Sequence, residues 1–205
     1  MRRVGRPRSV LGKRRCDYQA VGMSAPVVAE FGKLLATAAP AELGPGPRAG
    51  VQSEAALNLT LEDLFRRTKL PSAPQPLIRS LLLLWHDHLD AAHTLAQGIE
   101  TADGSFVHAI MHRREPDAWN SKYWWRRVGH HPAFPEIARR VAALLARSGR
   151  REDAELAARL VPGGKWDAAA FVDACAAAKD KMVIPTLREI QRLETEVLLE
   201  SFCHE

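Results

Sequence analysis

Cysteine and long apolar runs are both scarce in this chain of 205 residues. Its three cysteines, Cys16, Cys175 and Cys203, lie far apart. Their number and spacing exclude a disulfide framework and a paired-cysteine metal site, and they favour a reducing compartment. Apolar runs such as Leu81–Trp85 are far shorter than the ~20 residues that a membrane-spanning helix needs, and the N-terminus lacks the apolar stretch of a secretion signal. We therefore expect a cytoplasmic protein that does not contact a membrane.

Positive charge is concentrated at the N-terminus. The whole chain has a net charge of +5, but residues 1–22 carry seven basic residues and one acidic residue, which leaves residues 23–205 at −1. This composition does not support nucleic-acid binding by the body of the protein. Three interpretations of the Arg-rich segment stay open. It is a segment for import into an organelle, a nucleic-acid-binding tail, or an extension upstream of a start at Met23.

The pattern of the remaining residues predicts an all-α protein. No segment alternates convincingly between apolar and polar residues, and helix-capping and helix-ending residues recur along the chain. Residues 1–52 are rich in Arg and then in Ala, Pro and Gly, so we expect them to form a disordered basic tail. Residues 53–205 are expected to form a single compact helical domain of about six to eight helices. Candidate helices lie near residues 53–65, 76–97, 103–114, 117–128, 134–148, 151–160, 167–180 and 184–203.

Histidines form two polar stripes in the middle of the chain. On the expected helix 76–97, His86, Asp90 and His93 recur at helical spacing, opposite a face of leucines. The next helix carries His108 and His112 in the same way, followed by Glu115. Because the connection between the two helices is short, we expect them to be antiparallel, with His93 level with His108.

Two interpretations of these stripes remain open. If they face each other, they form a site for a divalent transition metal, because imidazole and carboxylate groups are the ligands that such ions bind. The candidate ligands are His86, Asp90, His93, His108, His112 and Glu115. A catalytic role in proton transfer is assigned to His86, Asp90, His93 and His112. In the second interpretation, each stripe is the solvated face of an amphipathic helix. A zinc-protease function is excluded, because Ala109 stands where that motif has its glutamate base.

Three of the five tryptophans lie in the next segment, residues 112–127, interleaved with five basic residues. Arginine binds phosphate and carboxylate groups through paired N–H donors. We therefore expect a small anionic ligand to contact Arg113, Arg126 and Arg127, with Asn120 and Tyr123 orienting it. In the alternative interpretation, the tryptophans belong to the core and the arginines pair with neighbouring carboxylates.

Three stretches also carry a resemblance. The stretches containing WHDHLDAAH, HAIMHRRE and KYWWRRVG resemble a group of uncharacterised microbial all-helical proteins, over roughly residues 77–135. The resemblance implies a helical fold in which this region is the working part. It implies no activity, substrate or catalytic residue.

Two functional hypotheses follow from these observations. In the first, a pocket rich in His, Asp, Glu and Arg binds a metal ion or a small anionic ligand, and an enzymatic role is open. In the second, the protein is a non-catalytic helical interaction module, with the last helix or the Trp/Arg segment contacting a partner. The sequence specifies neither a substrate nor an oligomeric state.

Overall fold

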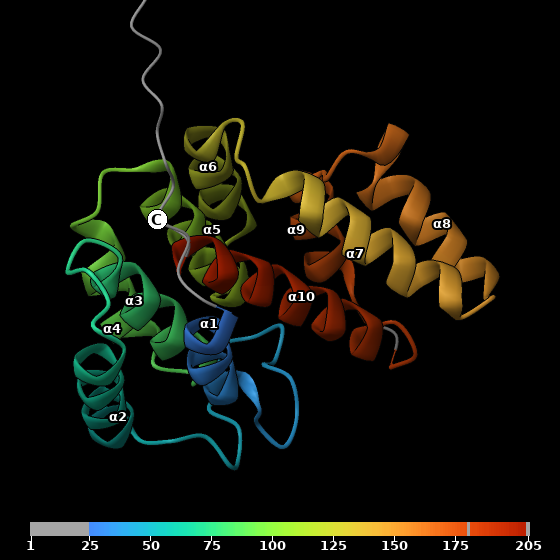
Figure 1. Cartoon of the computed structure of the whole chain (residues 1–205). Coiled ribbons are helices and arrows are strands. Elements are labelled where there is room, and N and C mark those ends of the chain that lie inside the picture. The colour runs from blue at the N-terminus through green and yellow to red at the C-terminus, as the bar shows by residue number, and fades with distance from the viewer. Residues whose placement is uncertain (1–24, 180, 204–205) are drawn as a thin grey trace, which may run out of the picture.

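The computed structural model describes residues 25–179 and 181–203, and these residues form no β-strand (Figure 1). The described part holds ten α-helices and two short 3-10 helices, η1 and η2, which confirms the all-α class but exceeds the six to eight helices expected. The expectations for residues 1–22 and for a start at Met23 lie outside it. None of the described helices has the length and apolar character that crossing a lipid bilayer requires. The elements are α1 (Ala25–Gly32), η1 (Lys33–Leu35), α2 (Glu54–Thr68), α3 (Gln75–Trp85), α4 (Leu89–Gln97), α5 (Ala102–Arg114), α6 (Ala118–Val128), α7 (Phe134–Arg147), α8 (Arg151–Leu160), η2 (Pro162–Gly164), α9 (Ala168–Ala177) and α10 (Ile184–Phe202).

Side-chain caps define where several helices begin. Ser53, Thr101, Asp117 and Asp167 each accept a hydrogen bond from a backbone N–H in the first turn of the helix that follows. Such caps satisfy donors that the first turn would otherwise leave without a partner. At the other end of α6, Gly129 has a φ of 63°, a conformation that glycine adopts without steric cost.

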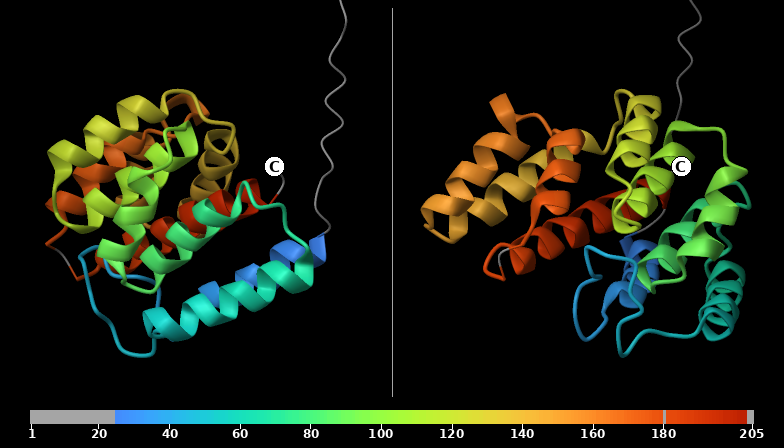
Figure 2. Two further views of the ribbon diagram at one scale, coloured as in Figure 1. Left: turned by 90° about the vertical axis from the view of Figure 1, so that its left-hand side faces the viewer. Right: turned by 180° about the vertical axis from the view of Figure 1, so that it is seen from behind.

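α10 crosses the middle of the molecule and contacts helices at both of its ends (Figure 1). Helices α1, α2, α3 and α4 lie toward one end, and α7, α8 and α9 lie toward the other (Figure 2). α5 and α6 pack closely against each other between these two groups. This arrangement places the histidine-rich segment beside the centre of the protein.

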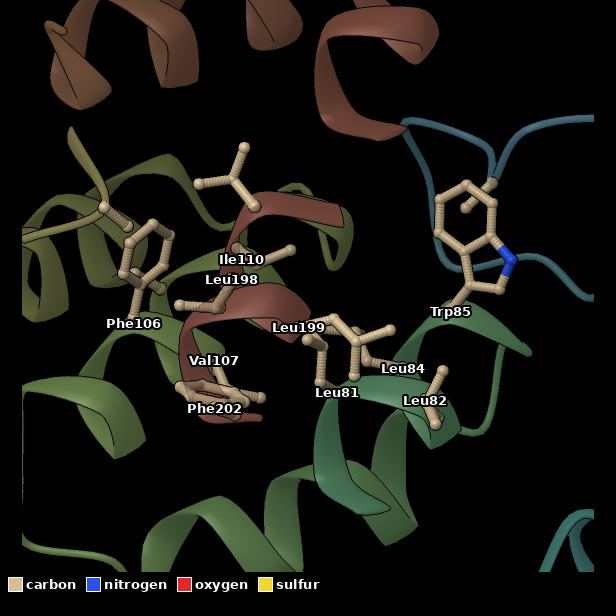
Figure 3. Close-up of a cluster of buried hydrophobic side chains, with 14 of the residues drawn as sticks. Leu81, Leu82, Leu84, Trp85, Phe106, Val107, Ile110, Leu198, Leu199 and Phe202 are labelled. Carbon is tan, nitrogen blue, oxygen red and sulfur yellow. The ribbon is translucent and has the colours of Figure 1, made fainter. Parts of the chain in front are cut away.

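Apolar side chains of α3, α5 and α10 form the core around this centre (Figure 3). The middle of α5 has no exposed side, because every residue from Gly104 to Arg114 is buried. Burial of this apolar surface is the main favourable contribution to folding. The residues labelled in Figure 3 are Leu81, Leu82, Leu84, Trp85, Phe106, Val107, Ile110, Leu198, Leu199 and Phe202.

Part of the stretch expected to be a tail packs on the helices. Residues 25–52 contain α1 and η1, and Phe31, Leu34, Leu35 and Ala41 are buried in the core. Their spacing gives this segment an apolar face that the abundance of Ala, Pro and Gly around it obscured. In the structure the packed part of the protein therefore begins before residue 53.

The long helix expected over residues 76–97 is two helices. α3 ends at Trp85 and α4 begins at Leu89, and between them Asp87 has a φ of 69°. Neither Gly nor Pro marks this break. Instead, the Asp87 carboxylate accepts hydrogen bonds from the side chains of Arg48 and Arg114, two residues that are distant in the sequence. Contacts with distant residues therefore override the helical pattern at this point.

Candidate metal centre

Three histidines meet where α4 packs on α5. His93 comes from the middle of α4, and His108 and His112 lie one turn apart on α5. One ligand atom from each of the three lies within 4.8 Å of the others. This is the only such group of three or more potential metal ligands in the described ranges, 25–179 and 181–203.

A close approach of the backbone holds α5 in position against the end of α4. A Cβ atom placed on Gly104 would lie 2.1 Å from the carbonyl oxygen of Ile99, a distance that no side chain tolerates. Glycine at this position therefore lets the first turn of α5 sit directly on the chain that leaves α4. The register that results places the His93 and His108 rings next to each other, with centroids 4.7 Å apart.

The ring geometry of the cluster is well defined. His93 meets His108 edge to face at 81°, and it meets His112 at a centroid distance of 5.6 Å and an angle of 70°. His108 and His112 are nearly parallel, with centroids 5.5 Å apart. On its other side, His108 stacks on Trp124 of α6 at 4.0 Å and 2°, and the guanidinium of Arg127 lies 5.3 Å from the centre of the Trp124 ring system. From the interior outward, the stack therefore consists of the His108 imidazole, the Trp124 indole and the Arg127 guanidinium.

Glu115 determines which nitrogen of His112 carries the proton. Its Oε2 lies 3.0 Å from His112 Nδ1, and a carboxylate only accepts hydrogen bonds, so Nδ1 is the protonated nitrogen of the neutral ring. The lone pair is then on Nε2. Asn120 Nδ2 lies 3.4 Å from the same Nδ1 atom. Glu115 therefore orients His112 from the side, whereas the Asn120 amide nitrogen is itself a donor and cannot hydrogen-bond to the protonated Nδ1.

Burial favours the neutral form of the two histidines on α5, His108 and His112. Burial, together with the nearby imidazoles of His93 and His112, lowers the pKa of His108 to about 4. Burial also lowers the pKa of His112, although Glu115 opposes the effect. At neutral pH both rings therefore have a free lone pair. In addition, Nδ1 of His108 is buried and has no hydrogen-bond partner.

His86 and Asp90, two expected members of the site, do not join the cluster. The break at Asp87 turns His86 away from the face that carries His93, and His86 instead binds the N-terminal segment. Its Nδ1 accepts from the Gln52 N–H at 3.1 Å and its Nε2 lies 2.9 Å from the Leu34 carbonyl oxygen. Asp90 is exposed in the first turn of α4.

The five residues expected to bind an anion do not converge either. Arg113 is buried on the far side of α5, where its Nη2 donates to Glu194 Oε2 at 2.6 Å. Arg126 and Arg127 are exposed on α6 and lie over the rings of Tyr123 and Trp124, respectively.

The interpretation of both histidine stripes as solvated faces is also wrong for α5, because His108 and His112 are 1% and 7% exposed.

One residue of the cluster's surroundings escaped the sequence analysis. One interpretation of the sequence placed the tryptophans in the core, and Trp124 is half-buried against it, but no interpretation anticipated that it lies flat on His108. No local pattern signals this contact, since it depends on how α6 lies across α5. The only indication of this contact in the sequence is that histidines and tryptophans occur on the consecutive helices α5 and α6.

Comparison with known proteins adds no assignment: no protein-family model, no curated protein and no solved structure matches the chain.

Proposed function

We propose that this protein binds a divalent transition-metal ion through His93, His108 and His112. The observation that carries the proposal is the convergence of three imidazoles, two of them buried, with ligand atoms within 4.8 Å of one another. Neutral imidazole is a preferred ligand of zinc, copper, nickel and iron. An unpartnered buried nitrogen such as His108 Nδ1 costs ~1–3 kcal/mol, and coordination would remove that cost.

The distances suit a metal after a small adjustment. A tetrahedral zinc ion with bonds of ~2.0–2.1 Å to nitrogen brings its ligand atoms to about 3.4 Å from one another. The present separations of up to 4.8 Å close to that value through rotation of the side chains. His93 is only half-buried, so it has the most room to move.

The surroundings of the cluster support the same function. Metal-binding histidines commonly donate their second ring N–H to a carboxylate, which fixes the tautomer and makes the ligand nitrogen more basic. Glu115 provides this contact for His112, so we assign it to orienting a ligand rather than to binding the ion. Stacking on Trp124 fixes the plane of His108.

Three protein ligands leave a coordination position for water or a substrate. A zinc-bound water has a pKa near ~7 and acts as a nucleophile at neutral pH. The proposed site would therefore support metal-assisted hydrolysis or hydration of a small substrate. This step depends on solvent reaching the ion past His93.

Metal analysis of the purified protein tests the proposal. We expect stoichiometric zinc, nickel or cobalt by inductively coupled plasma mass spectrometry after reconstitution and desalting. His93→Ala should lose the metal while keeping the helical circular dichroism signal. His130→Ala, which changes an exposed histidine outside the cluster, is the matched control and should retain it. Failure of the folded wild-type protein to bind any of these ions would overturn the proposal.

A second candidate function is interaction with another protein through the outer face of α6. Trp119 is 74% exposed, and its ring stacks on Tyr123 with centroids 6.4 Å apart. Exposed tryptophan and tyrosine are typical of the centres of protein interfaces. If this face joins two copies of the chain, light scattering will show association that depends on concentration and is abolished by Trp119→Ala.

A further inference from the structure

A cavity separate from the histidine cluster lies where α6 meets the start of α7, η2 and the start of α9. It has a volume of about 560 Å³, which falls in the range of ~300–1,000 Å³ that is usual for sites that bind small molecules. Three cationic side chains and one carboxylate complete a wall that is otherwise apolar and rich in aromatic rings. The apolar part consists of Trp125, Phe134, Pro162, Trp166, Ala168 and Ala169.

The three cations come from two separate elements. Lys122 and Arg126 lie one turn apart on the face of α6 that also carries Trp125, and Lys165 follows η2 in the chain. A basic composition does not explain this gathering, because residues 23–205 together have a net charge of −1. Positive charge is therefore concentrated locally at this cavity.

Two of the three cations are not neutralised by the protein. Lys122 Nζ pairs with Asp173 Oδ1 at 2.6 Å. Neither Arg126 nor Lys165 forms an ion pair with a carboxylate within residues 25–179 and 181–203. The guanidinium of Arg126 lies 6.0 Å from the centre of the Tyr123 ring, a contact that uses none of its N–H donors. Both side chains are exposed, so their donors have room to turn toward a ligand.

The carboxylate in the wall, Asp167, is engaged by α9. Its Oδ1 accepts a hydrogen bond from the Ala170 N–H at 2.8 Å, and the positive end of the helix dipole offsets part of its charge. Once the contacts of Asp167 and Asp173 are taken into account, two positive charges remain without a counter-charge. An anion that enters the cavity therefore meets cations of its own.

We propose that this cavity binds a small organic phosphate monoester, with the phosphate between Arg126 and Lys165 and the organic part against the aromatic wall. A phosphate monoester carries a charge of about −1.5 to −2 at neutral pH, which matches the two available cations. A carboxylate would leave one of them unmatched. Arginine binds phosphate through paired N–H donors and lysine binds it as a point charge. Because both cations are exposed, the phosphate keeps contact with water and avoids the cost of full burial.

This site is independent of the metal proposal. It shares no residue with the histidine cluster. The two sites also use different faces of α6, because Trp124 stacks on His108 whereas Trp125 lines the cavity. Loss of the metal site and loss of the phosphate site are therefore separate outcomes.

Isothermal titration of the full chain with phenyl phosphate tests the inference. We expect saturable binding that is at least about tenfold tighter than that of phenol, which lacks the charge, and of inorganic phosphate, which lacks the apolar part. The protein should bind phenyl phosphate equally well after chelator treatment and desalting. This comparison distinguishes the cavity from a metal ion at the histidines that binds the phosphate.

Two pairs of variants locate the binding site. Arg126→Ala should weaken phenyl phosphate binding by about tenfold, whereas Arg127→Ala changes the adjacent exposed arginine, which does not line the cavity, and should leave binding intact. Ala169→Glu places a negative charge at an exposed position of the wall and should also weaken binding by about tenfold. Ala169→Gln has nearly the same size without the charge and should weaken it much less. A glutamate in the first turn of a helix is favourable, so Ala169→Glu should fold.

Four results would overturn the inference. They are no phenyl phosphate binding to the folded wild-type protein, equal affinity for phenyl phosphate and either phenol or inorganic phosphate, equal losses in Arg126→Ala and Arg127→Ala, and loss of binding when metal is removed. If Arg126→Ala fails to fold, as judged by circular dichroism, the comparison of Ala169→Glu with Ala169→Gln decides instead, and equal affinity in that pair would overturn the inference.

Discussion

The imidazole of His108 lies flat on the indole of Trp124, with ring centroids 4.0 Å apart and ring planes 2° apart. This contact covers one face of His108 and contributes to the burial that lowers the pKa of this histidine. It also restricts rotation of the ring about its side-chain bonds. The contact thus links an aromatic residue of α6 to both the protonation state and the orientation of a proposed metal ligand.

Replacing Trp124 should change the titration of His108. In Trp124→Leu, solvent reaches one face of the imidazole, so its pKa should rise from about 4 toward the ordinary value of 6.5. An NMR titration that follows the histidine ring protons measures this shift. Trp119→Leu replaces an exposed tryptophan on the same helix and should leave His108 unchanged. A His108 pKa that is identical in both variants would contradict the role given to Trp124.

The metal-free protein should lose stability at mildly acidic pH. His108 has a lower pKa in the folded state, about 4, than the 6.5 of an exposed histidine, so the unfolded chain binds the extra proton between these values. Stability is therefore fully present above about pH 6.5 and falls as the pH drops toward about 4, by at most ~1.4 kcal/mol per pH unit for this one group. Urea unfolding at several pH values measures the slope.

His108→Phe provides the control for that slope. Phenylalanine keeps an aromatic ring against Trp124 but does not titrate, so stability should depend less steeply on pH in this interval. An equally steep dependence in the variant would assign the effect to other groups.

Removing the carboxylate of Glu115 should weaken metal binding without abolishing it. In Glu115→Gln, the side chain no longer favours the tautomer of His112 that has its lone pair on Nε2. Changes to such orienting residues typically reduce metal affinity by about 10–100-fold. Competition with a chromophoric chelator measures the affinity. Glu152→Gln, an exposed change on α8, should bind metal as the wild type does, and equal affinity in both variants would exclude Glu115 from the site.

Asp87 should be essential for the packing of residues 25–52. Its carboxylate is 1% exposed and pairs with the buried side chains of Arg48 and Arg114. Asp87→Asn keeps a residue that tolerates the left-handed conformation but leaves both arginines without their anion, a change that costs ~3–5 kcal/mol in buried pairs. Chemical denaturation measures the loss. Asp90→Asn alters an exposed carboxylate nearby and should cost little.

The starts of several helices were predictable from the sequence. The candidate helices near residues 53–65 and 167–180 do begin at these positions, where Ser53 and Asp167 act as caps, because a side-chain oxygen accepts hydrogen bonds from the next few backbone N–H groups. The pairing of His93 with His108 was equally accessible. A short connection and helical periodicity place the two residues level with each other, whereas the close approach at Gly104 brings their rings together.

The break between α3 and α4 was not predictable in the same way. It depends on Asp87 binding Arg48 and Arg114, which are 39 and 27 residues away in the sequence. The same break removed His86 from the expected site and made it a partner of Gln52. Long-range ion pairs of this kind leave no local pattern, so the sequence favoured one continuous helix and an overly large set of metal ligands.

Anomalous diffraction from crystals of the zinc-loaded protein tests the central claim most directly. We expect one strong peak at the zinc edge, within ~2.0–2.1 Å of one nitrogen each from His93, His108 and His112, with Nε2 as the contributing atom of His112. Absence of a peak at these residues, with zinc bound elsewhere or not at all, would contradict the metal site.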